Sequence, residues 1–365
     1  MAARPRILLA PAAGDGVGGG HVMRSLALAQ ALTAQGARCA FAVNAAGRSI
    51  LETFSDTAWP IEPIETGADV LVIDNYAIGA DQERALKSHA AMLAVIDDLA
   101  DRPHLADLLV DPGDGRTPAD YMGLVPNGAT LLMGPAYALL RSKFAERRVE
   151  RRTTQNAEIG RVFVSFGLSD VDGVTGRAVA ALRPLAPSAV FDIALPSTAA
   201  SLAMLRTLAA SDPGVKLHVD ATDVDRLLLD ADVAIGAGGA STWERCCLGV
   251  PSIAVSVAEN QRPLIERLSA SGVVLGLTLT PNIPAKAGTQ SGPDQAVGGA
   301  GSPPSRGHSD IFEVQLGQAF LRLPDPTVRA EFAAKSLAAC DGQGAGRVAE
   351  AILAQLSRIA SAAGS

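Results

Sequence analysis

The chain has 365 residues, of which 48% are hydrophobic and 19% charged, with a formal net charge of −7. This length fits two domains of about 150–200 residues, and the composition is that of a globular protein, which excludes a disordered chain. Because 38 acidic residues outnumber 31 basic ones, we do not expect a general nucleic-acid binder. The four cysteines, Cys39, Cys246, Cys247 and Cys340, form no CxxC pair, so neither a disulfide scaffold nor a structural zinc site is expected.

The first apolar segment, residues 6–10, has the length of one strand. Neither an apolar run of about 18 residues nor a signal-peptide pattern follows it. We therefore expect a cytoplasmic protein without a membrane contact.

In the first half of the chain, short apolar runs alternate with helix-like segments. The runs cover residues 6–10, 39–43, 70–74, 92–97 and 108–111. Continuous apolar strands separated by helices are typical of a parallel sheet with both faces covered. A dense charged run at 146–152 then predicts a linker between domains.

The second half repeats this alternation, with apolar runs at 161–167, 190–195, 215–219, 233–236 and 253–257. The sequence thus predicts an α/β protein with two doubly wound domains facing a cleft, where ligands lie outside the C-terminal strand ends. We place the domains at 1–150 and 151–345, followed by a C-terminal helix and tail at 346–365. Residues 282–309, rich in glycine, proline and serine, predict a flexible surface insertion in the second domain.

The first candidate site is a glycine-rich loop that leads from the first strand into a helix. Gly19 and Gly20 immediately precede His21, and Arg24 follows one helical turn later. Backbone N–H groups at a helix start can face an anion. The same helix end disfavours a protonated imidazole, so His21 should be neutral near pH 7 and able to act as a general base. The alternative is a histidine that only caps the helix or belongs to a polar loop.

The second candidate site is the run from Gly238 to Glu244, which follows a strand and opens a helix. Ser241 or Thr242 can cap this helix, and Glu244 can complete a capping box with Ser241. The functional interpretation, compatible with the first, is a diphosphate cradle. Gly238 and Gly239 would let the ligand approach, the following amides would hold its oxygens, and Glu244 would accept from ribose hydroxyls.

Other polar residues follow predicted strands and should reach the cleft: Tyr76, Gly167, Asn260 and Gln261. The pair Asp97 and Asp98 could indicate a metal or acid–base site, but we favour hydrogen bonding to loop amides. We assign Trp59 and Trp243 to the core.

Four segments together resemble one enzyme family: GHVMR at 20–24, DNY at 74–76, VIDDLADR at 95–102 and GAGGASTWERCCLG at 236–249. It is the family of UDP-2,4-diacetamido-2,4,6-trideoxy-β-L-altropyranose hydrolases of pseudaminic acid biosynthesis. The resemblance spans about residues 5–280 and resumes at 310–355. The glycine-to-glutamate part of the last segment is shared with lipid II GlcNAc transferases, which have the same two-domain GT-B architecture.

The resemblance implies that water attacks the anomeric carbon of this UDP-sugar with inversion, releasing UDP and 2,4-diacetamido-2,4,6-trideoxy-L-altrose. It implies no metal or other cofactor, a small UDP-sugar as the partner, no nucleic acid or membrane, and a monomer. The family's catalytic histidine falls on His21, its nucleotide-binding segment on residues 239–244, and further contacts on Tyr76 and residues 260–261. Leu168 stands where the family often has a glycine, which could alter a sugar or phosphate contact.

This chemistry fits the residue types. A nucleoside diphosphate needs little protonation to leave, so the paired carboxylates of ordinary glycosidases are unnecessary and one base suffices.

Two alternatives stay open, a GT-B glycosyltransferase using a UDP-sugar donor and a non-catalytic UDP-sugar-binding protein. The N-terminal domain shows no basic amphipathic stretch for a membrane acceptor, and His21 together with residues 239–244 argues against the non-catalytic alternative. An NAD-dependent oxidoreductase is disfavoured because no acidic residue ends the second strand.

Overall fold

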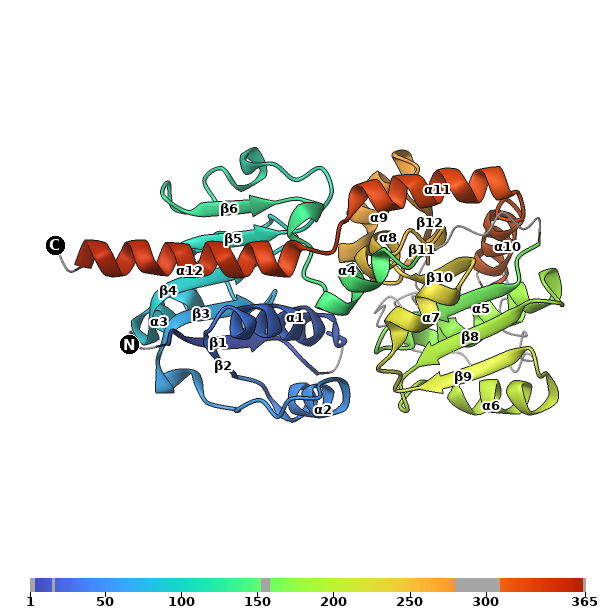
Figure 1. Ribbon diagram of the computed structural model, residues 1–365, viewed down its shortest axis with the longest axis horizontal. Coiled ribbons are helices and arrows are strands. Elements are labelled where there is room, and N and C mark those ends of the chain that lie inside the picture. Colours follow the sequence, from blue (N-terminus) through green and yellow to red (C-terminus); the bar gives the residue numbers. More distant parts are fainter. Residues whose placement is uncertain (1–3, 15–16, 152–157, 280–308, 364–365) are drawn as a thin grey trace, which may run out of the picture.

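The computed structural model describes residues 4–14, 17–151, 158–279 and 309–363. The named strands form two separate sheets, each with six strands that pair in parallel. Figure 1 shows helices flanking both sheets. This arrangement confirms the predicted α/β class with two doubly wound halves.

The first sheet has the strand order β2-β1-β3-β4-β5-β6. Its strands are β1 (Arg6–Pro11), β2 (Arg38–Phe41), β3 (Ala68–Asp74), β4 (Ala90–Ile96), β5 (Leu108–Asp111) and β6 (Thr130–Met133). The helices of this half are α1 (Gly20–Ala34), α2 (Ala45–Phe54) and α3 (Ala80–Leu86). The central strands are buried over nearly their whole length because helices cover both faces, which explains their continuous apolar runs.

The second sheet has the order β12-β11-β10-β7-β8-β9. Its strands are β7 (Arg161–Ser165), β8 (Val190–Leu195), β9 (Val215–Val219), β10 (Val233–Ala237), β11 (Ser252–Ser256) and β12 (Leu275–Thr278). The helices of this half are α4 (Ser142–Arg148), α5 (Val174–Leu182), α6 (Leu202–Ser211), α7 (Val224–Asp230), α8 (Ser241–Cys247), α9 (Arg262–Ala270), α10 (Ser309–Phe320) and α11 (Pro326–Ala339). α12 (Gly344–Ala363) ends the described chain.

Two strands, β6 and β12, lie outside the predicted set. Both are four-residue strands at the edge of a sheet, and most of their residues are only half-buried or exposed. Their apolar runs are short, since β6 has only residues 131–133 and Gly276 interrupts β12, so neither has the longer run that identified the other strands.

The chain crosses between the two halves and later returns. After α11, the chain passes Cys340 and enters α12, which lies along the first half in Figure 1. Val348 and Ile352 of α12 are fully buried in the same core as Leu28 and Leu32 of α1. The last helix therefore contributes to the core of the first half, although it follows the second half in sequence.

The described part of the charged run predicted as a linker, residues 146–151, is hydrogen-bonded to the second half. Phe144 of α4 is buried with residues of the second half. Arg148 donates hydrogen bonds to the carbonyls of Leu337 (2.7 Å), Cys340 (2.8 Å) and Cys247 (2.8 Å). The run lies between β6 of the first sheet and β7 of the second, and Arg148 fixes it to the second half through the carbonyls where α8 and α11 end.

The predicted insertion at 282–309 lies outside the described residues, apart from Ser309, the first residue of α10. In the described part of the chain, no helix combines the length and apolar character needed to cross a bilayer.

We predict that Arg148→Ala lowers the free energy of unfolding by about 2–4 kcal/mol, because three carbonyls at the return crossing lose their donor. Urea denaturation followed by circular dichroism measures this change. Arg84→Ala is the matched control, since the Arg84 side chain is 68% exposed and pairs only with Asp81, within α3. Equal stabilities of the two variants would contradict the role given to Arg148.

Candidate active site

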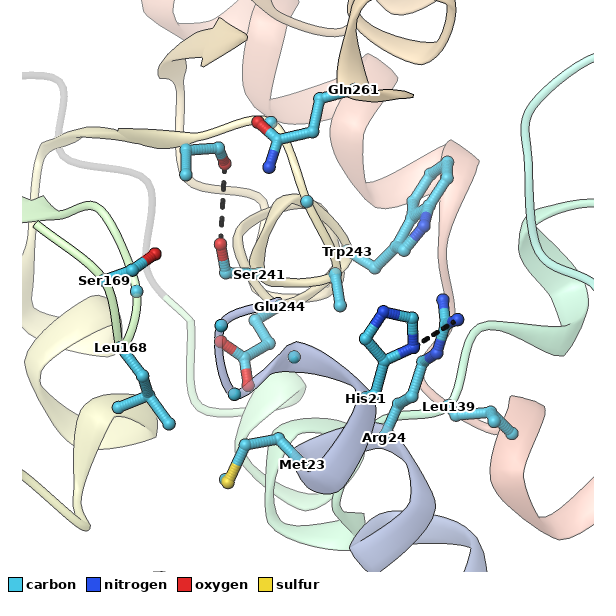
Figure 2. Close-up of a pocket in the computed structure, with 18 of the residues that line it drawn as sticks. His21, Met23, Arg24, Leu139, Leu168, Ser169, Ser241, Trp243, Glu244 and Gln261 are labelled. Atoms are coloured by element: carbon cyan, nitrogen blue, oxygen red, sulfur yellow. Dashed lines mark hydrogen bonds between the residues drawn. The ribbon is translucent and has the colours of Figure 1, made fainter. Parts of the chain in front are cut away.

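A cavity of about 350 Å³ lies between the two halves. Its lining comes mainly from the segments after β1, β3, β4, β5 and β6 of the first sheet, and from the end of β8 and the segments after β7, β9, β10 and β11 of the second. Ligands of doubly wound folds are expected at such carboxyl strand ends. Figure 2 shows a close-up of this cavity.

The structure brings nearly all the predicted site residues together here. The lining includes Gly19, Gly20, His21, Arg24, Tyr76, Gly167, Gly238, Gly239, Ser241, Glu244, Asn260 and Gln261. Thr242 does not line the cavity. It is fully buried, and its hydroxyl donates to the Ala237 carbonyl (3.4 Å) inside the second half.

His21 is held by a buried carboxylate at the end of the neighbouring strand. Pro11 of β1 pairs with Asp74 of β3, so the start of α1 and the end of β3 lie together. His21 Nδ1 is 2.5 Å from Asp74 Oδ1. His21 is 6% exposed and Asp74 is not exposed at all. Gly19, not His21, precedes the helix as its N-cap, so the alternative of a capping histidine is excluded.

Arg24 keeps Asp74 ionised. Its Nε donates to Asp74 Oδ2 (2.7 Å), and its Nη2 donates to Asp74 Oδ1 (2.5 Å). Burial alone would raise the pKa of Asp74, but the charges and hydrogen bonds of Arg24 and His21 lower it to about 2. An ionised carboxylate can only accept hydrogen bonds, so the 2.5 Å contact requires a proton on His21 Nδ1, which also lies 3.1 Å from Arg24 Nη2. In the ring that carries one proton, Nε2 therefore holds the lone pair.

Tyr76 and Asp98 also contact His21 and Arg24. The Tyr76 hydroxyl donates to Asp98 Oδ1 (2.6 Å), and Arg24 Nη1 donates to Asp98 Oδ2 (2.8 Å). The Tyr76 ring meets the His21 ring edge-on, with centroids 4.6 Å apart. Burial raises the pKa of Tyr76, so it stays a phenol. The imidazole is thus oriented by Asp74 directly and by Asp98 through Tyr76 and Arg24.

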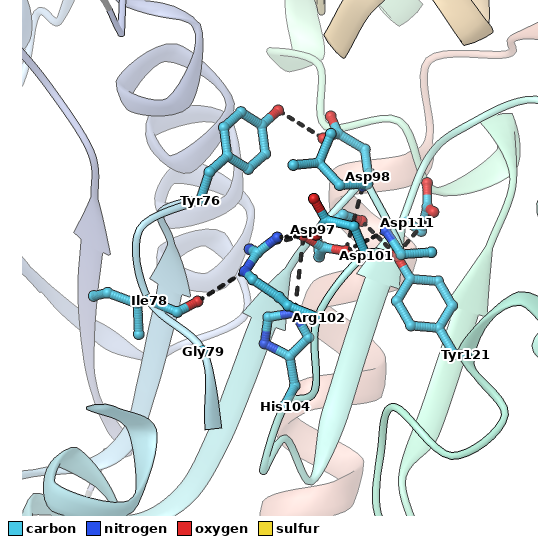
Figure 3. A network of polar contacts seen from close by, with 12 residues as sticks. Tyr76, Ile78, Gly79, Asp97, Asp98, Asp101, Arg102, His104, Asp111 and Tyr121 are labelled. Atoms are coloured by element: carbon cyan, nitrogen blue, oxygen red, sulfur yellow. Dashed lines mark hydrogen bonds and ion pairs between the residues drawn. The ribbon is translucent and has the colours of Figure 1, made fainter. Parts of the chain in front are cut away.

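A second polar network lies behind Asp98, as Figure 3 shows. Asp97 Oδ2 accepts from the amides of Leu99 (3.3 Å) and Ala100 (2.9 Å), which confirms the predicted loop-amide role. The Tyr121 hydroxyl lies 2.9 Å from both Asp97 Oδ2 and Asp111 Oδ2. One phenol proton cannot serve two carboxylates, and burial raises the pKa of Asp111 to about 6. Among the residues the structure describes, no cluster suits a metal ion.

The predicted capping box at α8 is wrong. Ala240 is the N-cap, and no side chain caps the helix. Ser241 lies in the first turn, so its hydroxyl donates back to the Ala237 carbonyl (3.5 Å). Glu244 has no capping role and its side chain lines the cavity instead (Figure 2).

The glycines before α8 have two different roles. A Cβ on Gly238 would lie 2.5 Å from Ile265 of α9, so Gly238 allows β10 and α9 to pack. A Cβ on Gly239 would meet Gln261 Nε2 at 3.6 Å, an ordinary contact, so packing does not require glycine there, and Gly239 lines the cavity.

Arg141 is a cavity residue that the sequence analysis missed. It follows the unpredicted strand β6, at the crossing into the second half, and lines the cavity. Its guanidinium lies over the Phe144 ring (5.5 Å) and 3.8 Å from Glu244 Oε1, beyond hydrogen-bond distance. Burial raises the pKa of Glu244, and Arg141 opposes that shift. No motif marks this arginine, because it belongs to a generally charged stretch.

Leu168 joins the two walls of the cavity. It lies in the loop after β7 and contacts the glycine loop after β1. A Cβ on Gly19 would be 2.3 Å from Leu168 Cδ1, so a larger residue at position 19 would require the Leu168 side chain to move. Leu168 therefore packs against the glycine loop at the cavity wall.

Comparisons with known proteins place the fold. No family model matches the chain. The chain is 22% identical over 262 residues to the UDP-2,4-diacetamido-2,4,6-trideoxy-β-L-altropyranose hydrolase of Campylobacter jejuni, covering 70% of this chain and 93% of that protein. It is 26% identical over 162 residues to the spore coat polysaccharide biosynthesis protein SpsG of Bacillus subtilis, covering 44% and 47%.

Similar solved structures cover nearly the whole chain. MurG of Acinetobacter baumannii superposes with a TM-score of 0.60 at 15% identity, covering 96% of this chain and 99% of that one. MnaA of S. aureus, solved with UDP, gives 0.60 at 11% identity, covering 97% of each chain. The spinosyn rhamnosyltransferase SpnG, solved with thymidine diphosphate, gives 0.56 at 15% identity, covering 94% and 100%. The chain therefore has the GT-B fold.

We predict that Asp111 makes the protein less stable as the pH rises from about 4 to 6. Its folded-state pKa of about 6 lies above the unfolded value of about 3.9, so the unfolded chain loses this proton first. Relative to Asp111→Asn, the wild type should lose about 2–3 kcal/mol across this window. The pKa of Asp74 is lowered to about 2, so its own effect on stability falls below this pH window. Urea denaturation at several pH values measures the difference, and parallel curves for the two proteins would contradict the prediction.

Proposed function

We propose that this protein hydrolyses UDP-2,4-diacetamido-2,4,6-trideoxy-β-L-altropyranose to UDP and 2,4-diacetamido-2,4,6-trideoxy-L-altrose, with inversion. The observation that carries the proposal is the contact of His21, which lines the cavity, with the buried Asp74, 2.5 Å away. The Campylobacter relative supports the choice of substrate through its name.

His21 acts as the general base. Its Nε2 accepts a proton from water while the water oxygen attacks the anomeric carbon, and the bond from that carbon to the diphosphate oxygen breaks. The positive charge on the imidazole is then stabilised by Asp74 through the Nδ1–H bond. Because His21 is buried and fixed by its neighbours, little reorganisation is needed at the moment of reaction.

The diphosphate is held between the two halves. The first amides of α1, beginning at Gly20, have no partner within the helix and can face phosphate oxygens. Arg141 adds a positive charge from the crossing segment. Both stabilise the negative charge that grows on UDP as it leaves. Gly239 lets the ligand approach the backbone closely, and Glu244 accepts hydrogen bonds from the ribose.

A glycosyltransferase is the second candidate function. It is favoured by the likeness to MurG and to the spinosyn rhamnosyltransferase, which share the fold. The same base would then deprotonate an acceptor hydroxyl in place of water. The assay below distinguishes the two reactions, because a transferase releases little UDP without its acceptor.

The test is release of UDP from the named UDP-sugar in ¹⁸O-water with EDTA present. We predict that ¹⁸O enters the sugar at its anomeric carbon and that His21→Ala slows UDP release by about 10²-fold or more. His89→Ala is the matched control, because His89 does not line the cavity and should leave the rate unchanged.

Three outcomes would contradict the proposal. Entry of ¹⁸O into UDP would mean that the phosphorus–oxygen bond breaks. Binding of the UDP-sugar without release of UDP would favour a transferase or a non-catalytic binding protein. An unchanged rate in His21→Ala would remove the assigned base.

A further inference from the structure

Trp243 carries a hydrogen-bond donor at the cavity wall that the fold does not use. It is the third residue of α8, is 3% exposed, and lines the cavity. Its indole N–H can only donate. Among the residues the structure describes, no acceptor takes this N–H. This N–H is not one of the buried unpartnered atoms of the described residues, so it is accessible at the cavity wall and free to donate to a ligand there.

The other tryptophan shows the contrast. Trp59 Nε1 donates to Ser55 Oγ (2.9 Å), and the Trp59 ring packs edge-on against Phe41, away from the cavity. Assigning both tryptophans to the core is therefore incomplete, because Trp243 is at once a core residue and part of the cavity wall.

The position of Trp243 indicates which part of the ligand it contacts, the sugar or the nucleotide. Figure 2 shows Trp243 on the side of α8 that faces His21, whereas Leu168 and Ser169 lie on the opposite side. If His21 acts at the anomeric carbon, as proposed above, Trp243 faces the sugar and not the nucleotide. Leu140 and Leu264 line the same cavity and pack in the core cluster of Trp243, so the wall around the N–H is apolar.

We propose that the Trp243 N–H donates a hydrogen bond to the carbonyl oxygen of an acylamino group on the sugar. A carbonyl supplies the missing acceptor, and the methyl group beside it suits the apolar wall formed by Leu140 and Leu264. Trp243 thereby selects acylated amino sugars over their free amines. This inference rests on the proposed function for the orientation of the ligand.

Binding measurements test it separately from turnover. Titration calorimetry measures the affinities for UDP and for the diacetamido UDP-sugar of two proteins, the His21→Ala variant and the same variant with Trp243→Phe added. We expect about tenfold weaker binding of the UDP-sugar to Trp243→Phe and unchanged binding of UDP. Unchanged UDP binding also shows that the variant is folded. Trp59→Phe, which removes an N–H that already has a partner, should bind both ligands like its parent.

The UDP-linked 2,4-diamino sugar, which lacks both acetyl groups, completes the comparison. It should bind with equal affinity to the proteins with and without Trp243→Phe, because it has no acylamino carbonyl for the Trp243 N–H. Equal affinity of Trp243 and Trp243→Phe for the diacetamido sugar would overturn the inference. An equal loss for UDP and UDP-sugar would also overturn it, since Trp243 would then act only through packing. Failure of the proposed hydrolysis would instead appear as absent UDP release by the wild type.

Discussion

The ionised carboxylate of Asp74 organises the candidate site. It lies at the end of a buried strand and receives hydrogen bonds from His21 and Arg24. Burial opposes its charge, and the guanidinium of Arg24 offsets that penalty, so its pKa falls to about 2. Because the carboxylate can only accept, it determines which nitrogen of His21 carries the proton. The chemistry proposed for the cavity depends on that single assignment.

The two halves of the molecule form this cavity together. The first half supplies His21, and the second supplies Glu244 and Trp243. Arg148 binds the carbonyls where the chain leaves the second half, and α12 then completes the core of the first half. Leu168 of the second half contacts Gly19 of the first at the cavity edge. Substrate contacts and the base can therefore come from different halves and still meet.

Much of this arrangement could be predicted from the sequence. Central strands buried on both faces leave long continuous apolar runs, whereas the apolar runs of the edge strands β6 and β12 are only one to three residues long. Glycine loops and strand-end polar residues identified most of the cavity lining, because parallel strands all point their carboxyl ends at it. The contacts of Asp74 with His21 and of Arg141 with Glu244 could not be predicted, because each joins residues that are far apart in the sequence. The prediction that Thr242 binds the ligand is wrong, because its position on α8 turns the side chain into the core and away from the cavity.

The most direct test of the account is the protonation site of the His21 ring. Nitrogen NMR of protein labelled with ¹⁵N at histidine distinguishes a protonated ring nitrogen from one that carries a lone pair, and the spectrum of His21→Ala assigns the signals. The account predicts that the His21 ring, when it carries one proton, holds it on Nδ1, with a lone pair on Nε2. A proton on Nε2 with a bare Nδ1 would contradict it, because His21 could then not accept a proton from water at the cavity.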